Sequence, residues 1–204
     1  MNLPSLLQAF IWQNKKNKIR KKSDLLFKSD FLFLCKIAPS TLCIIIQNMK
    51  IKIIALGKIK EKFLKEGIDE FLKRLTPYAS VEIIELTPVE IRDENLTAKA
   101  LEQEGAKILA NIKNDSYVIT MEILGKQLSS EDFANKINEI SISGISELIF
   151  VIGSSCGLSP IVSQRANFKL SFSKMTFLHQ FARLLLVEQI YRAFKILKGE
   201  TYHK

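Results

Sequence analysis

The segment LIFVIGSSCGLSP, residues 148–160, is the part of the sequence that says most about how this chain folds. Five apolar residues of strand length run into a loop bounded by Gly153 and Gly157, and Ser159 before Pro160 is typical of a helix start. In parallel sheets, ligands bind beyond the carboxyl ends of the strands, where glycine lets the backbone approach them. The loop is neither G-x-G-x-x-G nor a P-loop, so it does not favour dinucleotide or nucleoside triphosphate binding. By itself it predicts either a ligand-binding loop or a tight structural turn.

Segments of strand length and of helix length alternate on both sides of this loop. Most of the strand-length runs are rich in β-branched residues and are bounded by Gly, Pro, Ser or Asn. The expected strands are 51–56, 81–86, 117–123, 148–152 and 168–172, and the expected helices are 60–75, 97–112, 130–140, 160–166 and 177–197. Such alternation predicts an α/β fold in which helices cover both faces of a largely parallel sheet. We expect one domain, residues 49–204, because no repeat or flexible linker interrupts it.

Residues 1–48 have a different character. The block KKNKIRKK, residues 15–22, precedes an apolar run at 31–46, an order typical of a signal or anchor. Lys36 and Pro39 interrupt that run, which leaves pieces shorter than the ~20 apolar residues of a membrane-spanning helix. Met49 then opens the first expected strand. We therefore expect residues 1–48 to be an extension outside the fold, upstream of the true start at Met49; the alternatives are a disordered basic arm and a membrane anchor.

The net charge of +9 arises mostly from this extension. It holds eight Lys or Arg against two Asp, whereas the remaining 156 residues carry 22 basic and 19 acidic groups. The charge of the domain alone therefore does not distinguish a nucleic acid from any other partner.

Cysteine and histidine limit the possible chemistry. Cys35, Cys43 and Cys156 show no C-x-x-C spacing, so neither a zinc site nor a disulfide framework is expected, as in a protein of the reducing cytosol. The two histidines, His179 and His203, lie near the end of the chain. Cys156 lies in the glycine loop, but it is far along the chain from either imidazole, so we do not expect it to be a nucleophile.

The last expected helix, 177–197, combines His, Arg and Glu with apolar residues. Arg183 falls within about 40° of His179 by helix geometry, and both follow a loop of small hydroxyl residues, so they are functional candidates. Glu188 and Arg192 have the i,i+4 order of an ordinary helix ion pair. Apolar residues between these two polar edges predict a helix packed on more than one face, either against a second subunit or only within its own core.

The chain ends in Gly-Glu-Thr-Tyr-His-Lys, residues 199–204. Chain ends are usually frayed, so the tail is expected to bury little surface and to contribute little stability. An aromatic ring, an imidazole and a cation in three successive residues could instead hold a base and its phosphate.

Three segments together closely resemble one family. They are MKIKIIALGKIKEKFLKEGIDEFLKRLTPY (49–78), FVIGSSCGLSP (150–160) and SFSKMTFLHQFARLLLVEQIYRAFKILKGETYHK (171–204). The family is RlmH, the large-subunit ribosomal RNA pseudouridine N3-methyltransferases of the SPOUT superfamily. The resemblance covers residues 49–204 and none of 1–48, and its C-terminal part is highly specific.

The resemblance implies a parallel α/β sheet whose C-terminal segment forms a trefoil knot. It also implies that S-adenosyl-L-methionine is the cofactor and that it lies bent in the knot. The cofactor-binding residues carried over to this chain are Met121, Gly153, Phe172, Ser173, Lys174, Met175, Thr176 and Phe177. The expected protein is a cytoplasmic homodimer, packed partly through its last helix, and its expected substrate is a pseudouridine in helix 69 of large-subunit ribosomal RNA on assembled ribosomes. No metal and no membrane are expected.

The acceptor nitrogen, N3 of pseudouridine, belongs to a weakly acidic imide, so it must lose a proton before it can attack the methyl group. A cation that stabilises the imidate, or a general base, would help. We expect Arg183 to be the cation, His203 the base, supplied by the same or by the other subunit, and Tyr202 to hold the target base, with His179 as a further catalytic candidate.

Two positions depart from the family pattern. Ser154 replaces the second glycine of an Ile-Gly-Gly loop, and Leu178 replaces the proline before the histidine. We expect both to weaken cofactor affinity, since serine limits backbone approach and proline would stiffen the loop. The alternatives are a SPOUT methyltransferase acting on tRNA or another ribosomal RNA site, and a ribosome-binding module without activity.

Overall fold

The computed structural model describes residues 49–90 and 96–202. The expectations about residues 1–48, and those about His203, fall outside the described residues. The strands are β1 (Lys50–Leu56), β2 (Ser80–Leu86), β3 (Tyr117–Gln127), β4 (Glu147–Ile152) and β5 (Phe168–Ser171). The helices are α3 (Lys62–Leu75), α4 (Thr97–Leu109), α5 (Ser130–Ile142), α6 (Pro160–Arg165) and α7 (His179–Leu197).

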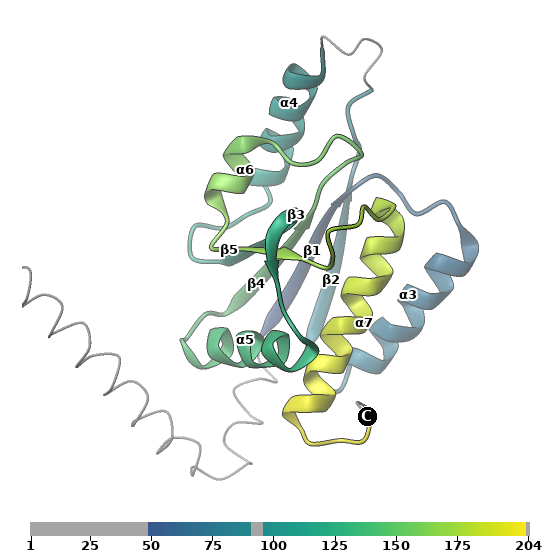
Figure 1. Ribbon diagram of the computed structural model, residues 1–204, viewed down its shortest axis with the longest axis vertical. Coiled ribbons are helices and arrows are strands. Elements are labelled where there is room, and N and C mark those ends of the chain that lie inside the picture. The colour runs from purple at the N-terminus through teal and green to yellow at the C-terminus, as the bar shows by residue number, and fades with distance from the viewer. Residues whose placement is uncertain (1–48, 91–95, 203–204) are drawn as a thin grey trace, which may run out of the picture. The chain divides into compact units, whose positions relative to one another are not determined.

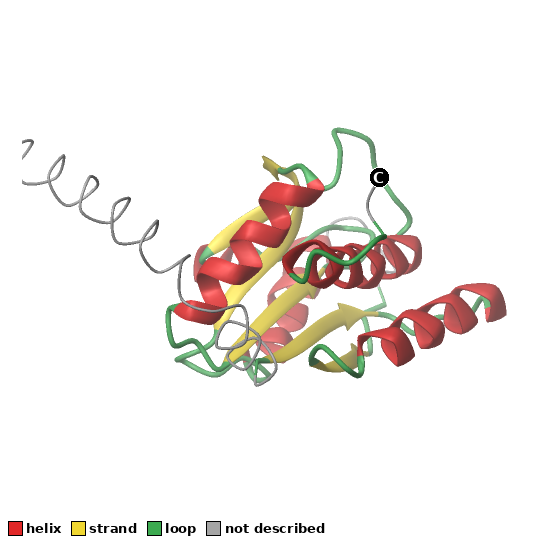
Figure 2. Ribbon diagram, turned by 90° about the horizontal axis from the view of Figure 1, so that it is seen from below, coloured by secondary structure: helices red, strands yellow, loops and turns green. Residues whose placement is uncertain are grey.

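The five strands form one parallel sheet in the order β2-β1-β4-β3-β5. Helices α4 and α6 lie together on one side of the sheet, while α3 and α7 run side by side (Figure 1). Figure 2 shows the strands running between helices. The α/β class and the parallel sheet are therefore confirmed.

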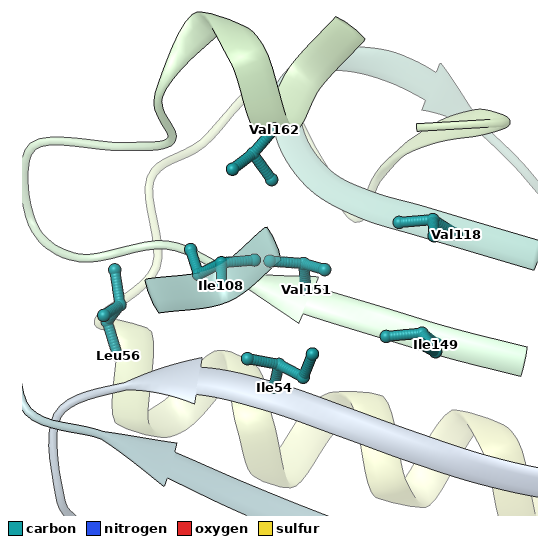
Figure 3. Close-up of a cluster of buried hydrophobic side chains, with 7 residues drawn as sticks. All are labelled: Ile54, Leu56, Ile108, Val118, Ile149, Val151 and Val162. Atoms are coloured by element: carbon teal, nitrogen blue, oxygen red, sulfur yellow. The ribbon is translucent and has the colours of Figure 1, made fainter. Parts of the chain in front are cut away.

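Alternate residues of the central strands pack toward opposite layers, as the two-residue period of a strand requires. On one face, seven buried residues contributed by β1, β3, β4, α4 and α6 form an apolar cluster: Ile54, Leu56, Ile108, Val118, Ile149, Val151 and Val162 (Figure 3). On the other face, Phe150 of β4 meets Phe133 of α5 with ring centroids 6.1 Å apart. Burial on both faces explains why β4 reads as a continuous apolar run instead of an alternating one.

Each expected strand and helix is present, with two differences that matter for the site. Strand β3 continues to Gln127 instead of ending at Ile123, and its pairing with β5 shifts register between Met121 and Lys126. Helix α7 begins at His179, which leaves Phe177 in the preceding loop. The trefoil knot stays a prediction, because strand order and register do not specify how a loop is threaded.

The end of α7 is tied down, contrary to the expectation of a frayed tail. Gly199, with a φ of +64°, follows the helix, and the N–H groups of Gly199 and Glu200 donate to the carbonyls of Ile196 and Lys195, which is a Schellman motif. The Glu200 carboxylate pairs with Lys195 and accepts a hydrogen bond from the Tyr78 hydroxyl (2.8 Å). The described chain is therefore anchored to the body of the domain up to this turn.

In the described part of the chain, no helix is both long and apolar enough to cross a membrane.

Candidate functional site

A cavity of about 820 Å³ lies beyond the carboxyl ends of β3, β4 and β5. This is where a parallel sheet presents ligand sites, and the volume is that of a small-molecule pocket. Four stretches of chain line it: the end of β3, the glycine loop with the start of α6, the segment between β5 and α7, and the first turn of α7. The lining residues are Met121–Leu124, Ile152–Leu158, Pro160, Ser163, Leu170–Ser173, Met175–His179 and Ala182.

The glycine loop needs its first glycine. A Cβ on Gly153 would lie 2.3 Å from the carbonyl oxygen of Gly157, far inside contact distance, so only glycine allows this fold of the loop. The loop is closed by a hydrogen bond from the Gly157 N–H to the Ser154 carbonyl (3.0 Å), and Gly157 has a φ of +89°. The two interpretations of this loop, a tight structural turn and a ligand-binding loop, are therefore compatible, because the tight turn brings the loop backbone to the wall of the cavity.

Ser154 anchors the loop to α4. Its hydroxyl donates to Oε2 of Glu104 (3.0 Å), and Oε1 of the same carboxylate accepts from the Val89 N–H (3.0 Å). Glu104 is only 3% exposed, so these donors satisfy a buried charged group. No local pattern marked Glu104 as a site residue, because a glutamate within a helix is usually solvated.

The end of β3 contributes a carboxylate to the cavity. Glu122 accepts hydrogen bonds from the hydroxyls of Thr120 (2.6 Å) and Ser163 (2.9 Å), and Lys169 lies 3.8 Å away. The adjoining register shift requires Gly125, where a Cβ would lie 2.7 Å from the backbone of Leu170. The sequence predicted Met121 in the site but neither Glu122 nor the register shift; the available signal was Gly125, just beyond the apolar strand.

The segment between β5 and α7 covers the cavity. The Ser173 side chain accepts from the Met175 N–H (3.0 Å), and the rings of Phe172 and Phe177 meet edge to face with centroids 6.4 Å apart. Of the predicted cofactor residues, all except Lys174 line the cavity. The Lys174 side chain is exposed and is not part of the lining.

His179, the first residue of α7, also lines the cavity. Burial, followed by the neighbouring Arg183 guanidinium, lowers the pKa of His179 below its ordinary value of 6.5. The imidazole is therefore neutral near pH 7 and able to accept a proton. Cys156 lines the same cavity, although it lies 23 residues before His179 in the chain.

Arg183 is buried and hydrogen-bonded to two partners. Its side chain is 0% exposed, and it donates to Oε1 of Glu85 (2.6 Å) and to the carbonyl oxygen of Gly57 (2.9 Å). It is not part of the cavity lining. Its contacts hold the ends of β1 and β2 against α7, and its role toward an imidate stays a prediction.

Tyr202 lies far from the cavity of its own chain. Its ring packs edge to face on Tyr191 (centroids 4.9 Å apart) and under the Arg192 guanidinium (4.7 Å), and its hydroxyl donates to Glu188 (3.2 Å). Glu188 and Arg192 form the predicted i,i+4 ion pair (2.6 Å). At 1.5 Å per residue, this part of α7 is roughly 14–20 Å from His179.

The arrangement can enclose a nucleoside-sized molecule between apolar side chains and the backbone of the glycine loop. Glu122 brings a carboxylate to the cavity wall, with the Lys169 ammonium 3.8 Å away. Within residues 49–90 and 96–202, no group of three or more His, Cys, Asp or Glu side chains could hold a metal ion.

Comparisons with known proteins add the following. Residues 49–203 match a family model described as "Predicted SPOUT methyltransferase". A putative ribosomal RNA large subunit methyltransferase H of Methanococcus maripaludis is 52% identical over 160 residues, covering 76% of this chain and all of that protein. The ribosomal RNA large subunit methyltransferase H of Carboxydothermus hydrogenoformans is 54% identical over 160 residues, with the same coverage. The crystal structure of the A. aeolicus TrmH/SpoU tRNA modifying enzyme aligns with a TM-score of 0.37 at 10% identity, over 81% of this chain and 88% of that one.

Proposed function

This chain belongs to the SPOUT methyltransferase family, and from that premise we propose that it methylates N3 of a pseudouridine in helix 69 of large-subunit ribosomal RNA, with S-adenosyl-L-methionine as the methyl donor. The coarser part, methylation of large-subunit ribosomal RNA, has the support of relatives of that name that are more than half identical to it. The single observation that carries the proposal is that one cavity collects seven of the eight residues expected to bind the cofactor, from three separate stretches of chain.

The cavity suits this cofactor by its size and by its lining. The backbone cradle at Gly153 exists only because no Cβ fills it, and apolar side chains such as Met121, Leu170 and Phe172 offer faces for an adenine ring. Bound S-adenosyl-L-methionine would supply an electrophilic methyl group on a sulfonium, and methyl transfer from it is an in-line displacement that rewards positioning.

The residues of the chain would then orient the acceptor and move its proton. His179 is neutral and borders the cavity, so we propose it as a candidate acceptor for the imide proton. Arg183 would act by stabilising the imidate or by holding Gly57, the residue next to His179, through its carbonyl. Tyr202 would hold the target base and His203 would serve as a base, both at the cavity of a second subunit, because Tyr202 cannot reach its own.

We propose a homodimer built around this end of the molecule. Ile123, Leu124, Met175 and Leu178 surround the cavity with exposed apolar side chains, and Leu124 is 98% exposed. A monomer rarely leaves such a group of apolar side chains in water, and a second copy that covers them could also bring its tail to the cavity. Action on assembled ribosomes would place the protein in the cytoplasm.

Two measurements test the proposal. Ribosomes purified from cells that lack this protein should accept a methyl group from S-adenosyl-L-methionine when the purified protein is added. Mass mapping should locate that methyl group on a helix 69 pseudouridine. Methylation of tRNA or of another ribosomal RNA site would show the same fold at work on a different substrate. Calorimetry that detects no saturable binding of S-adenosyl-L-methionine would reduce the protein to a ribosome-binding module.

A further inference from the structure

The segment that joins β1 to the first turn of α3, residues 57–66, is an exposed basic surface. Its exposed charged residues are Lys58, Lys60, Glu61, Lys62, Lys65 and Glu66. Lys62 pairs with Glu66 at 3.6 Å, but both side chains are mostly exposed and such a pair is weak. In the part of the chain that the structure describes, Lys58, Lys60 and Lys65 have no ion pair. Their charges are therefore available to a partner.

An aromatic ring lies among these cations. Phe63, in the first turn of α3, is 62% exposed, while the next residue, Leu64, is buried and anchors the turn to the core. A large apolar ring in water among lysines is the combination that proteins use to stack on an unpaired base while holding the flanking phosphates. An ordinary solvated helix face would carry a polar residue at this position and would not need an aromatic ring.

This basic surface borders the cavity. A Cβ on Gly57 would lie 3.4 Å from Nε2 of His179, so the segment begins beside a residue that lines the cavity. The Lys60 N–H donates to Oε1 of Gln180 (3.1 Å), and Arg183 holds the Gly57 carbonyl (2.9 Å). Figure 1 shows α3 and α7 starting at the same end of the molecule.

We propose that Lys58, Lys60, Lys62, Lys65 and Phe63 bind the RNA strand next to the target nucleotide, the lysines through backbone phosphates and Phe63 by stacking on an unpaired base. This inference rests on the proposed function, since it assigns the surface on which that substrate lies. The contacts to Gln180 and Arg183 fix the surface relative to the cavity. Substitutions on this surface should therefore change the affinity for RNA without changing the affinity for the cofactor.

The lysines are tested by salt dependence. The double variant Lys58→Ala/Lys60→Ala keeps the backbone bond to Gln180, since that bond uses the main-chain N–H. Each lost phosphate contact lowers the slope of log Kd against log salt by about 0.7 to 0.9. The double variant loses two contacts, so its binding to 70S ribosomes, measured at constant Mg²⁺, should show a slope smaller by about 1.4 to 1.8. The KM for ribosomes should rise at least about tenfold near 150 mM KCl, with kcat and calorimetric binding of S-adenosylhomocysteine unchanged.

The control is Lys50→Ala/Lys73→Ala, which removes the same charge from exposed positions at the amino end of β1 and in the last turn of α3. It should leave the slope at the wild-type value. Equal slopes for the two double variants would overturn the proposal for the lysines, because the effect would then be one of net charge only.

Phe63 is tested by keeping or removing its ring. Phe63→Tyr should bind ribosomes like the wild type, whereas Phe63→Leu, which keeps apolar bulk, should bind them about tenfold more weakly. Light scattering should give the wild-type oligomeric state for both. If Phe63→Leu instead changes the oligomeric state, the ring belongs to a contact between copies and the proposal fails.

The wild type separates this inference from the proposed function. A wild-type protein that methylates no ribosomal RNA refutes the function. One that does, while the surface variants keep wild-type slopes and affinities, refutes only the RNA surface.

Discussion

Ser154 shows how one hydroxyl can replace a glycine without closing a site. Its side chain is engaged by the buried carboxylate of Glu104, which also accepts from the Val89 N–H. Glu104 therefore links the glycine loop to α4 and to the segment after β2. The structure gives serine an anchoring role at this position, where the sequence suggested only an obstruction to the cofactor.

Ser154→Gly should therefore destabilise the protein without improving cofactor binding. Losing one donor to a buried carboxylate costs about 1–3 kcal/mol, so the free energy of unfolding should fall by that amount. Denaturant titration and calorimetry with S-adenosylhomocysteine measure the two effects, with Ser155→Gly, an exposed neighbour, as the matched control. Tighter binding by Ser154→Gly at unchanged stability would show instead that serine obstructs the cofactor.

His179 should make stability sensitive to acid. Because burial and Arg183 lower its pKa in the folded protein, protonation of the imidazole opposes folding. Its contribution is fully present above its ordinary pKa of 6.5 and is lost as the pH falls through the lower, folded pKa. Between about pH 7.5 and about pH 5, the melting temperature of wild type should fall more than that of His179→Gln. Parallel pH profiles for the two proteins would contradict this.

At the scale of elements, α7 joins the site to the far end of the domain. Its first turn lines the cavity through His179 and Ala182, and its last turn ends in a glycine cap held by Glu200. Tyr202 then folds back onto Tyr191 and Arg192. The tail therefore has a structural role in its own chain in addition to any role toward RNA.

Tyr202→Ala should lower the free energy of unfolding by about 1 kcal/mol, because an aromatic pair contributes ~0.5–1.5 kcal/mol beyond area burial. Tyr202→Phe, which keeps the ring and loses only the hydroxyl bond to Glu188, should lose less. Thermal unfolding of the two variants, beside a chain shortened by residues 203–204 alone, measures this. Wild-type stability for Tyr202→Ala would restore the frayed-tail expectation.

The sequence predicted elements well and side-chain partners poorly, for physical reasons. Hydrophobic periodicity and glycine punctuation are local, so β4, the glycine loop and α7 were visible in the sequence. The pairing of Arg183 with Glu85, 98 residues apart, depends on how α7 packs beside β1 and β2, which no local pattern encodes. The extension of β3 past Ile123 depends likewise on pairing with β5 across a register shift.

At the scale of the whole molecule, cavity and tail lie at opposite ends of α7. Three strand ends, brought together by the β4-β3-β5 order, form the cavity, and the strongly exposed Leu124 stands at its edge. Tyr202 packs roughly 14–20 Å away along the helix. If both parts act on the same nucleotide, the active site must contain parts of two subunits.

Complementation between inactive subunits tests this arrangement. Gly153→Ala should lose cofactor binding, because its Cβ would meet the Gly157 carbonyl oxygen at 2.3 Å, while its tail stays intact. A chain lacking residues 202–204 should keep cofactor binding and lose methyl transfer to ribosomes. Each should be inactive alone. After they are mixed, half of the dimers are mixed, and one of the two sites in each joins an intact cavity to an intact tail, so about a quarter of the wild-type rate should return. His179→Ala replaces Gly153→Ala if that variant does not fold. No recovery in dimers shown by mass spectrometry to be mixed would mean that each subunit works alone, and the roles proposed for Tyr202 and His203 at a partner's cavity would be wrong.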